Sequence, residues 1–119
     1  MSKTDYEIHP LAGVPEDNPV PHLFRKKVTG DQALIAHIRL EKGCVVHPHN
    51  HPSEQISYCV SGKCMWTLGP NGDEHIVEGG TIMVFPGGCT HGVLALEDSL
   101  MIDVISPPAA MGVDKQGNR

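Results

Sequence analysis

The chain has 119 residues, of which 39% are hydrophobic and 19% are charged, and its formal net charge is −5. This length suits one domain and this composition can bury a core, which excludes two ordinary domains and wholesale disorder. The basic residues are scattered apart from residues 25–27, so we expect no nucleic-acid partner, because phosphate binding needs a concentrated basic face.

The sequence has no stretch that approaches the ~20 apolar residues of a membrane-spanning helix, and its first residues lack the apolar core of a secretory signal. We therefore expect a cytoplasmic protein without a membrane partner. Thiols stay reduced in the cytoplasm, so the four cysteines are predicted to be small buried hydrophobic residues rather than disulfides or zinc ligands.

In chain order, residues 1–21 are rich in Pro, Glu, Asp and Asn, which predicts an extended N-terminal arm. Residues 22–106 hold short apolar runs separated by Gly- and Pro-containing turns, without a convincing helical period. The predicted strands are 22–29, 33–40, 44–49, 55–60, 64–68, 74–77, 81–85, 91–96 and 100–105. This pattern indicates an all-β sandwich or barrel. Residues 107–119 have little to bury and are expected to form a flexible C-terminal tail.

Candidate metal ligands lie around the end of the third predicted strand. His49 and His51 are one residue apart and would share a face of a strand, so both imidazoles could bind one ion. His47 is an alternative partner for His49. The chain then turns at residues 52–53 and returns with Glu54 and Gln55, only one of which can face the site. The other four histidines have no partner at useful spacing and are expected to be ordinary exposed residues: His9, His22, His37 and His75.

Two gapped motifs carry a family resemblance. Residues 43–62 follow the pattern G-x5-H-x-H-x3-Q-x6-G, and residues 80–91 follow G-x5-P-x-G-x2-H. Together they resemble the paired signature of the cupin superfamily, and Ala95 stands where the second motif usually ends in Asn. The resemblance implies a single-domain cupin jelly-roll β-barrel over residues 22–106. It also implies one divalent metal ion, Ni, Zn, Mn or Fe, with four ligands: His49, His51, Gln55 and His91.

Gln55 affects the chemistry expected of such a site. Most cupin oxygenases resemble a pattern with glutamate at this position, whereas an amide oxygen leaves the full double charge on the ion. Such a site is a better Lewis acid and a poorer environment for Fe(III). We therefore expect a metal-dependent isomerase or lyase that acts on a small-molecule substrate rich in oxygen.

Two further segments, 54–62 and 91–108, resemble the pectin-degradation proteins that linearise unsaturated uronates. The resemblance implies that Asp103 is a catalytic residue that moves protons near the metal. Ala109 stands where that group has an arginine suited to a uronate carboxylate, and Ile105 replaces an aromatic residue. Arg25 or Arg39 could supply the missing cation.

Two other functions remain open from the sequence. One is a cupin dioxygenase or hydroxynitrile lyase, and the other is a non-enzymatic, metal-dependent sensor of a small ligand. The open edges of a small barrel, together with an N-terminal arm that could cross to a neighbour, predict a homodimer.

Overall fold

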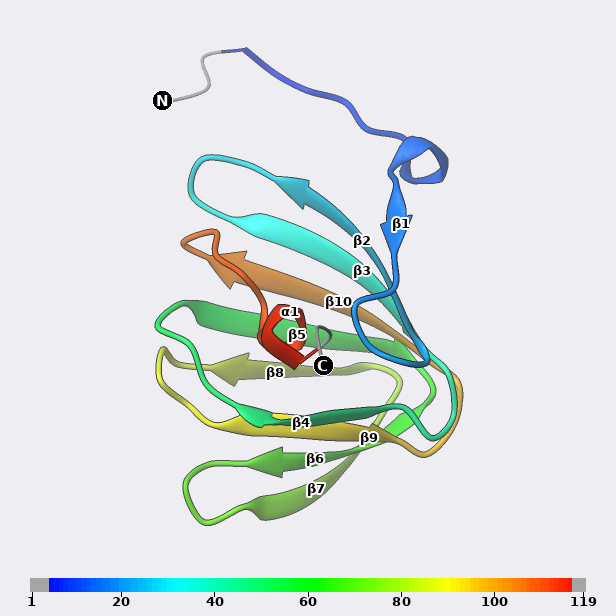
Figure 1. Ribbon diagram of the computed structural model, residues 1–119, viewed down its shortest axis with the longest axis vertical. Helices are drawn as coiled ribbons and strands as arrows, with labels where there is room; N and C mark the ends of the chain where they lie inside the picture. Colours follow the sequence, from blue (N-terminus) through cyan, green and yellow to red (C-terminus); the bar gives the residue numbers. More distant parts are fainter. Residues whose placement is uncertain (1–4, 117–119) are drawn as a thin grey trace.

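The computed structural model describes residues 5–116, except for the side chains of residues 115 and 116. Within this range the chain forms two antiparallel sheets that face each other (Figure 1). The strands are β1 (Glu16–Asp17), β2 (Leu23–Thr29), β3 (Leu34–Leu40), β4 (Val45–His49), β5 (Glu54–Ser61), β6 (Lys63–Leu68), β7 (Asp73–Glu78), β8 (Thr81–Phe85), β9 (His91–Ala95) and β10 (Ser99–Ser106). One sheet has the order β1-β2-β3-β10-β5-β8, and the other has the order β4-β9-β6-β7.

The all-β fold class is confirmed, and each predicted strand is present with its ends within one residue of the prediction. The agreement has a physical reason: the turn residues favour turns through their local backbone preferences, so they end each strand independently of tertiary packing. Three short elements were not predicted: η1 (Leu11–Gly13), β1 and α1 (Gly112–Gln116). Each is too short to leave a periodic signal in the sequence.

The core lies between the two sheets, and the period of two along each strand places the site inside it. On β10, Ser99, Met101, Asp103 and Ile105 are buried, while the residues between them are partly exposed. Met101 and Ile105 pack in the apolar core, so Asp103 occupies an inward position between them. A slip of one residue in the pairing of β10 would turn that carboxylate to the outside.

Part of the N-terminal arm pairs with its own chain. In β1, Glu16 and Asp17 lie opposite Lys26 and Arg25 of β2, at the edge of the larger sheet. Figure 1 shows the preceding segment leaving the barrel beyond this edge. Residues 1–4 of the predicted arm lie outside the described residues.

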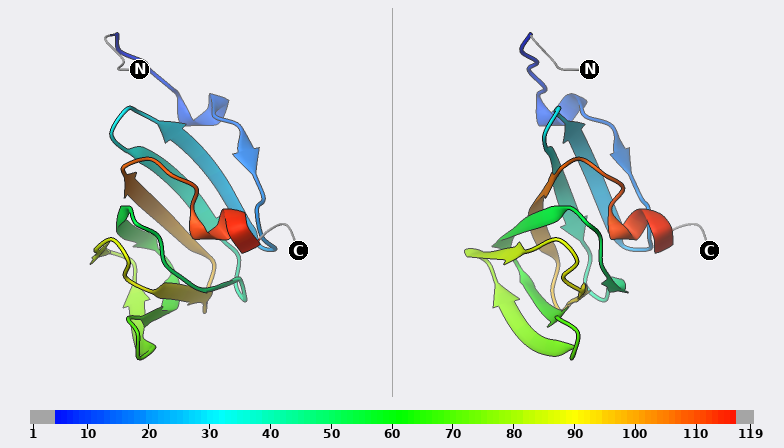
Figure 2. Two further views of the ribbon diagram at one scale, coloured as in Figure 1. Left: turned by 60° about the vertical axis from the view of Figure 1, so that its left-hand side comes forward. Right: turned by 90° about the vertical axis from the view of Figure 1, so that its left-hand side faces the viewer.

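The expectation that residues 107–119 have little to bury is wrong for the segment that leads into α1. Met111 and Val113 are each 5% exposed and belong to the core. The helix packs against β4, and Figures 1 and 2 show it between the strands of the two sheets, at one open end of the barrel. The apolar side chains at 111 and 113 drive this docking, since both leave water by covering the barrel interior. Residues 117–119 of the predicted tail lie outside the described residues.

Candidate metal centre

Two adjacent strands of the smaller sheet and one turn bring the three histidines together. His49 ends β4 and His91 begins β9, and the two residues are paired across the antiparallel ladder. His51 lies just beyond β4, in the turn that leads to β5. The ligand nitrogens of the three rings all lie within 4.8 Å of one another, with His51 and His91 buried. The structure thus brings together residues that are up to 42 positions apart (91 minus 49).

Each of these three imidazoles is oriented by a backbone carbonyl. A carbonyl oxygen can only accept, so each Nδ1 carries the proton, and the Nε2 of the neutral ring keeps its lone pair. The Nδ1 atoms of His49, His51 and His91 donate to the carbonyls of His47 (2.9 Å), Ser53 (2.9 Å) and Cys89 (2.8 Å), respectively. The three Nε2 lone pairs can therefore coordinate one ion, and orientation by such carbonyls is common among metal-binding histidines.

Gln55 adds a fourth candidate donor to this cluster, and this donor is an oxygen atom. Its amide Nε2 donates to the Ser57 hydroxyl at 2.9 Å and to Asp103 Oδ2 at 3.5 Å. Its Oε1 consequently points the other way and lies 3.0 Å from His51 Nε2. Two lone-pair atoms that face each other at this distance would be stabilised by a cation that both of them bind. The buried position of Gln55 and the exposed position of Glu54 agree with the motif.

His91 shows most directly that the residues fit a metal ion. Its Nε2 is buried and has no hydrogen-bond partner, and buried polar atoms are rarely left unpaired. The pKa of His91 is lowered to about 4, mainly by burial, while the hydrogen bond to Cys89 raises it and the neighbouring His49 and His51 add to the lowering. The ring is therefore neutral at physiological pH, which is the form that binds divalent metals.

A glycine loop holds the second motif against the first. The backbone N–H of Gly88 donates to the carbonyl of His51 at 2.8 Å. A Cβ built at Gly87 would overlap the carbonyl oxygen of Pro52, so only glycine permits this close approach. The loop after Pro86 thereby fixes the start of β9, and with it His91, beside the His51 turn.

Asp103 lies next to Gln55 inside the barrel. It is 6% exposed, and its Oδ1 has no hydrogen-bond partner. Burial raises the pKa of Asp103, which reaches about 6 although a hydrogen bond with Ser57 and the electrostatic interaction with His51 both lower it. Its burial shows that the carboxylate belongs to the interior of the barrel.

One cavity adjoins these groups, with His49, Gln55, His91 and Asp103 in its lining. Apolar side chains from both sheets make up most of the rest of the wall, and Met111, Gly112 and Val113 close it from the C-terminal segment. The cavity leaves about 40 Å³ for the centres of water-sized molecules, which is room for a few waters. No Lys or Arg of the described residues lines it.

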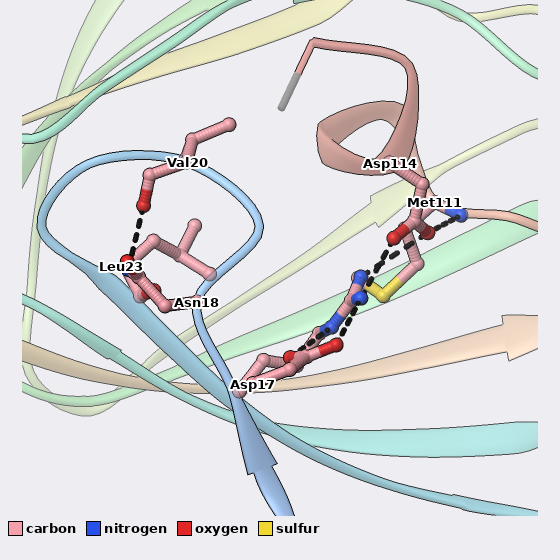
Figure 3. A network of polar contacts seen from close by, with 7 residues as sticks. Asp17, Asn18, Val20, Leu23, Met111 and Asp114 are labelled. Carbon is pink, nitrogen blue, oxygen red and sulfur yellow. Dashed lines mark hydrogen bonds and ion pairs between the residues drawn. The ribbon is translucent and has the colours of Figure 1, made fainter. Parts of the chain in front are cut away.

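Arg25 is occupied elsewhere. It is 2% exposed, and its guanidinium bonds Asp17 (3.1 and 2.8 Å) and Asp114 (3.2 and 2.7 Å). Figure 3 shows this network, in which Asp17 approaches from one side and Asp114, beside Met111, from the other. Burial works against the charged guanidinium, but the two carboxylates outweigh it and raise the pKa of Arg25. The network therefore connects β1 and α1 to β2.

Arg39 also lies away from the cavity. It is exposed, bonds Glu16 at 3.2 Å and stacks over the ring of Phe24 at 4.8 Å. The sequence left open whether Arg25 or Arg39 supplies a cation to the pocket, and neither side chain lines it. The direction of both side chains depends on strand register, because Arg25 faces inward toward the β1 and α1 carboxylates and Arg39 faces outward.

The remaining histidines and cysteines match their sequence expectations in most respects. His47, His9, His22 and His75 are exposed, and His37 is half-buried. Cys44, Cys59 and Cys64 are buried in the core without disulfides, while Cys89 is half-buried. Trp66, on β6, was not singled out from the sequence. It lines the cavity, and its buried Nε1 has no partner. The available signal was the position of the chain's single tryptophan within the strand predicted at 64–68.

Comparisons with known proteins show which family has this fold. A family model described as "Cupin domain" matches residues 36–105. The solved structure of KdgF from a Halomonas species is 28% identical, with a TM-score of 0.80 over 88% of this chain and 96% of that chain. An RmlC-like cupin from Shewanella frigidimarina is 20% identical, with a TM-score of 0.79 over 87% of this chain and 93% of that one.

Oxalate decarboxylase from Bacillus subtilis, a protein described with Mn(II) centres, is 18% identical with a TM-score of 0.75. The alignment covers 92% of this chain but only 32% of the decarboxylase, so that likeness concerns the fold. A search of curated proteins finds no match. Among residues 5–116, no helix is long and apolar enough to cross a membrane.

Proposed function

Because this chain belongs to the cupin domain family, we propose that it is a metal-dependent enzyme of the isomerase or ring-opening type. Its substrate is a small oxygenated molecule. One observation carries the proposal: the Nε2 atoms of three imidazoles converge beside the Gln55 amide oxygen and the unpaired Asp103 carboxylate oxygen. A donor set of this kind suits one divalent ion, and the adjoining carboxylate suits proton transfer.

We propose His49, His51, Gln55 and His91 as the ligands of one ion, which is Ni, Zn, Mn or Fe(II). When bound, such an ion acts as a Lewis acid that polarises an oxygen atom of the substrate. Because Gln55 is neutral, nothing in the ligand set offsets the double charge, and this favours non-redox chemistry over stabilisation of a higher oxidation state.

The protein's own residues have separable tasks in this scheme. Asp103 takes up or delivers a proton at Oδ1, the carboxylate oxygen that has no partner within the fold. Ser57 and Gln55 make hydrogen bonds with the Asp103 carboxylate, and these bonds fix its orientation. The apolar wall and residues 111–113 exclude water, which strengthens the electrostatic interactions inside the cavity.

The resemblance to uronate-linearising proteins, together with 28% identity to KdgF over nearly the full length of both chains, makes an unsaturated uronate the first substrate to test. The purified chain, loaded separately with Zn(II), Mn(II), Ni(II) or Fe(II), is incubated with unsaturated galacturonate, and ring opening is followed by NMR. We expect acceleration over buffer and over metal-free protein, and a large loss of rate in Asp103→Asn. A rate equal to buffer with every metal would contradict the uronate assignment.

The same preparations separate the alternative functions. A dioxygenase would consume oxygen with phenolic substrates, whereas we expect no oxygen uptake. A hydroxynitrile lyase would release cyanide from cyanohydrins. A sensor would bind its ligand without turnover, and Asp103→Asn would then reduce binding alone.

We also propose that the chain is a homodimer. The outer face of the larger sheet exposes apolar side chains on three strands, among them Ile35, Tyr58, Ile82 and Val84. β8 is an edge strand of that sheet, and exposed edges are commonly paired or covered. The cytoplasmic location and the absence of a nucleic-acid partner stay predictions.

A further inference from the structure

Three buried polar atoms of the described side chains lack a hydrogen-bond partner: Trp66 Nε1, His91 Nε2 and Asp103 Oδ1. All three residues line the same cavity. Unpaired buried polar atoms are uncommon in folded proteins, and their concentration in one cavity indicates that a bound molecule completes them. His91 is accounted for by the proposed metal ion, which leaves the indole and the carboxylate.

Trp66 and Asp103 lie on opposite walls of the cavity. Trp66 is on β6 of the smaller sheet, and Asp103 is on β10 of the larger one. The indole packs on Phe85 with ring centroids 5.3 Å apart, and Phe85 stacks on His91 at 4.8 Å with an interplanar angle of 12°. This packing holds Trp66 in place and connects it to the candidate metal centre.

The two unpaired groups have complementary chemistry. An indole N–H can only donate, and an ionised carboxylate can only accept. A molecule that satisfies both must therefore carry an acceptor oxygen for Trp66 and a hydroxyl for Asp103. The rest of the wall is mostly apolar, so the part of the molecule that enters the cavity must carry few further polar atoms.

We propose that Trp66 is a substrate-recognition residue. Its Nε1–H donates to the carbonyl oxygen of a small hydroxycarbonyl compound whose hydroxyl donates to Asp103 Oδ1. This inference rests on the proposed function, because it places the ligand in the same cavity, and it names the chemical class that the cavity selects. In this proposal Trp66 and Asp103 hold the oxygenated ligand in place of a Lys or Arg, neither of which is among the described lining residues.

A single tryptophan makes the proposal directly measurable, because the indole gives one N–H cross-peak in a proton–nitrogen NMR spectrum. The isotope-labelled full chain, loaded with diamagnetic Zn(II), is titrated with acetoin, which has one carbonyl and one hydroxyl. We expect the indole proton to shift downfield and saturate. Butanone, which lacks the hydroxyl, and butanediol, which lacks the carbonyl, are each expected to bind about tenfold more weakly, as suits the loss of one buried hydrogen bond.

Variants separate recognition from structure. Trp66→Phe keeps an aromatic ring and removes the donor, and we expect about tenfold weaker acetoin binding by calorimetry with unchanged zinc affinity. Tyr58→Phe is the matched control, since it removes a polar group from the exposed outer face and should bind acetoin like the wild type.

Several results would overturn the proposal: an indole resonance that does not move when acetoin saturates, absence of acetoin binding, or wild-type acetoin affinity in Trp66→Phe. A loss of zinc affinity in Trp66→Phe would also overturn it, because it would show a structural role. These experiments measure binding and not turnover. Their failure can therefore be distinguished from a failure of the uronate reaction.

Discussion

Each candidate ligand atom of the metal centre is oriented by a hydrogen bond that the other polar atom of the same side chain makes. Backbone carbonyls hold the three imidazoles, but the Gln55 amide depends on side chains, with its shorter hydrogen bond to the Ser57 hydroxyl and its longer one to Asp103. An amide can rotate to exchange its oxygen and nitrogen, so the acceptor at Ser57 determines which of the two faces the histidines. Ser57 is fully buried, and no solvent can replace it.

At this scale we predict that Ser57→Ala lowers zinc affinity by about 10- to 100-fold, the usual range for loss of a group that orients a metal ligand. Titration calorimetry of the wild type and the variant measures the change. Ser61→Ala is the control, because Ser61 lies on the same strand but is exposed. Wild-type affinity in Ser57→Ala would show that the Gln55 amide is oriented by other contacts.

At the scale of elements, the segment that leads into α1 covers the metal centre. Gly112 contacts the imidazole of His49 so closely that a Cβ added there would overlap the ring. Met111 and Val113 on either side are buried, so the backbone has little freedom to withdraw. The start of α1 and the candidate metal ligand His49 are therefore packed tightly against each other.

We predict that Gly112→Ala displaces either the His49 ring or the helix, because both cannot keep their positions. Zinc affinity should fall at least about tenfold, and α1 should become more accessible to proteases. Gly13→Ala is the matched control, since a Cβ at Gly13 meets nothing within 4 Å. Unchanged zinc affinity and unchanged proteolysis together would mean that the contact relaxes without consequence.

The ion pairs of Arg25 give the docking of α1 a pH dependence. Burial alone would raise the pKa of Asp114, but hydrogen bonds from Arg25 and from the Met111 backbone N–H outweigh it and lower the pKa. A carboxylate whose pKa is lowered by folding stabilises the fold above its unfolded pKa, about 3.9. That stabilisation is lost as the pH falls through the folded pKa.

We therefore predict that Asp114→Asn lowers the free energy of unfolding at pH 7 by about 1–2 kcal/mol. The difference from the wild type should shrink as the pH falls below about 4. Urea denaturation at several pH values measures both effects. Asp17→Asn should cost less, because Asp17 is 53% exposed. A difference that persists undiminished at acidic pH would assign the effect to packing rather than to charge.

At the scale of the whole molecule, the larger sheet presents a continuous apolar row on its outer face. Ile35, Val104, Ile56 and Val84 lie opposite one another across β3, β10, β5 and β8. Ile35 and Val84 are 48% and 58% exposed, respectively. Such a row suits the isologous contact of two identical sheets, in which each copy covers the other's apolar side chains.

We predict a dimer in sedimentation equilibrium, and a shift to monomer when Ile82 and Val84 are both changed to Lys. The substitutions place charges on an exposed face and should leave the fold and zinc affinity intact. Ile76→Lys on the smaller sheet, where the side chain is 55% exposed, should remain dimeric. A monomeric wild type would contradict the proposal.

The sequence by itself determined the strands and the histidine pattern. Turn residues and a period of two are local properties, so they fixed each strand within one residue, and the spacing of His49, His51 and His91 marked the residues that the fold brings together. The motif also distinguished Gln55 from Glu54, since neighbours on a strand face opposite ways.

Only the tertiary structure decided what surrounds those ligands. Arg25 meets Asp114 across 89 positions of sequence, and that contact, together with the burial of Met111 and Val113, turns an expected loose tail into a cover over the site. Trp66 and Asp103 acquire their roles from two facing sheets. Such relations depend on long-range packing and on the absence of competing partners inside the core, and neither leaves a periodic signal along the chain.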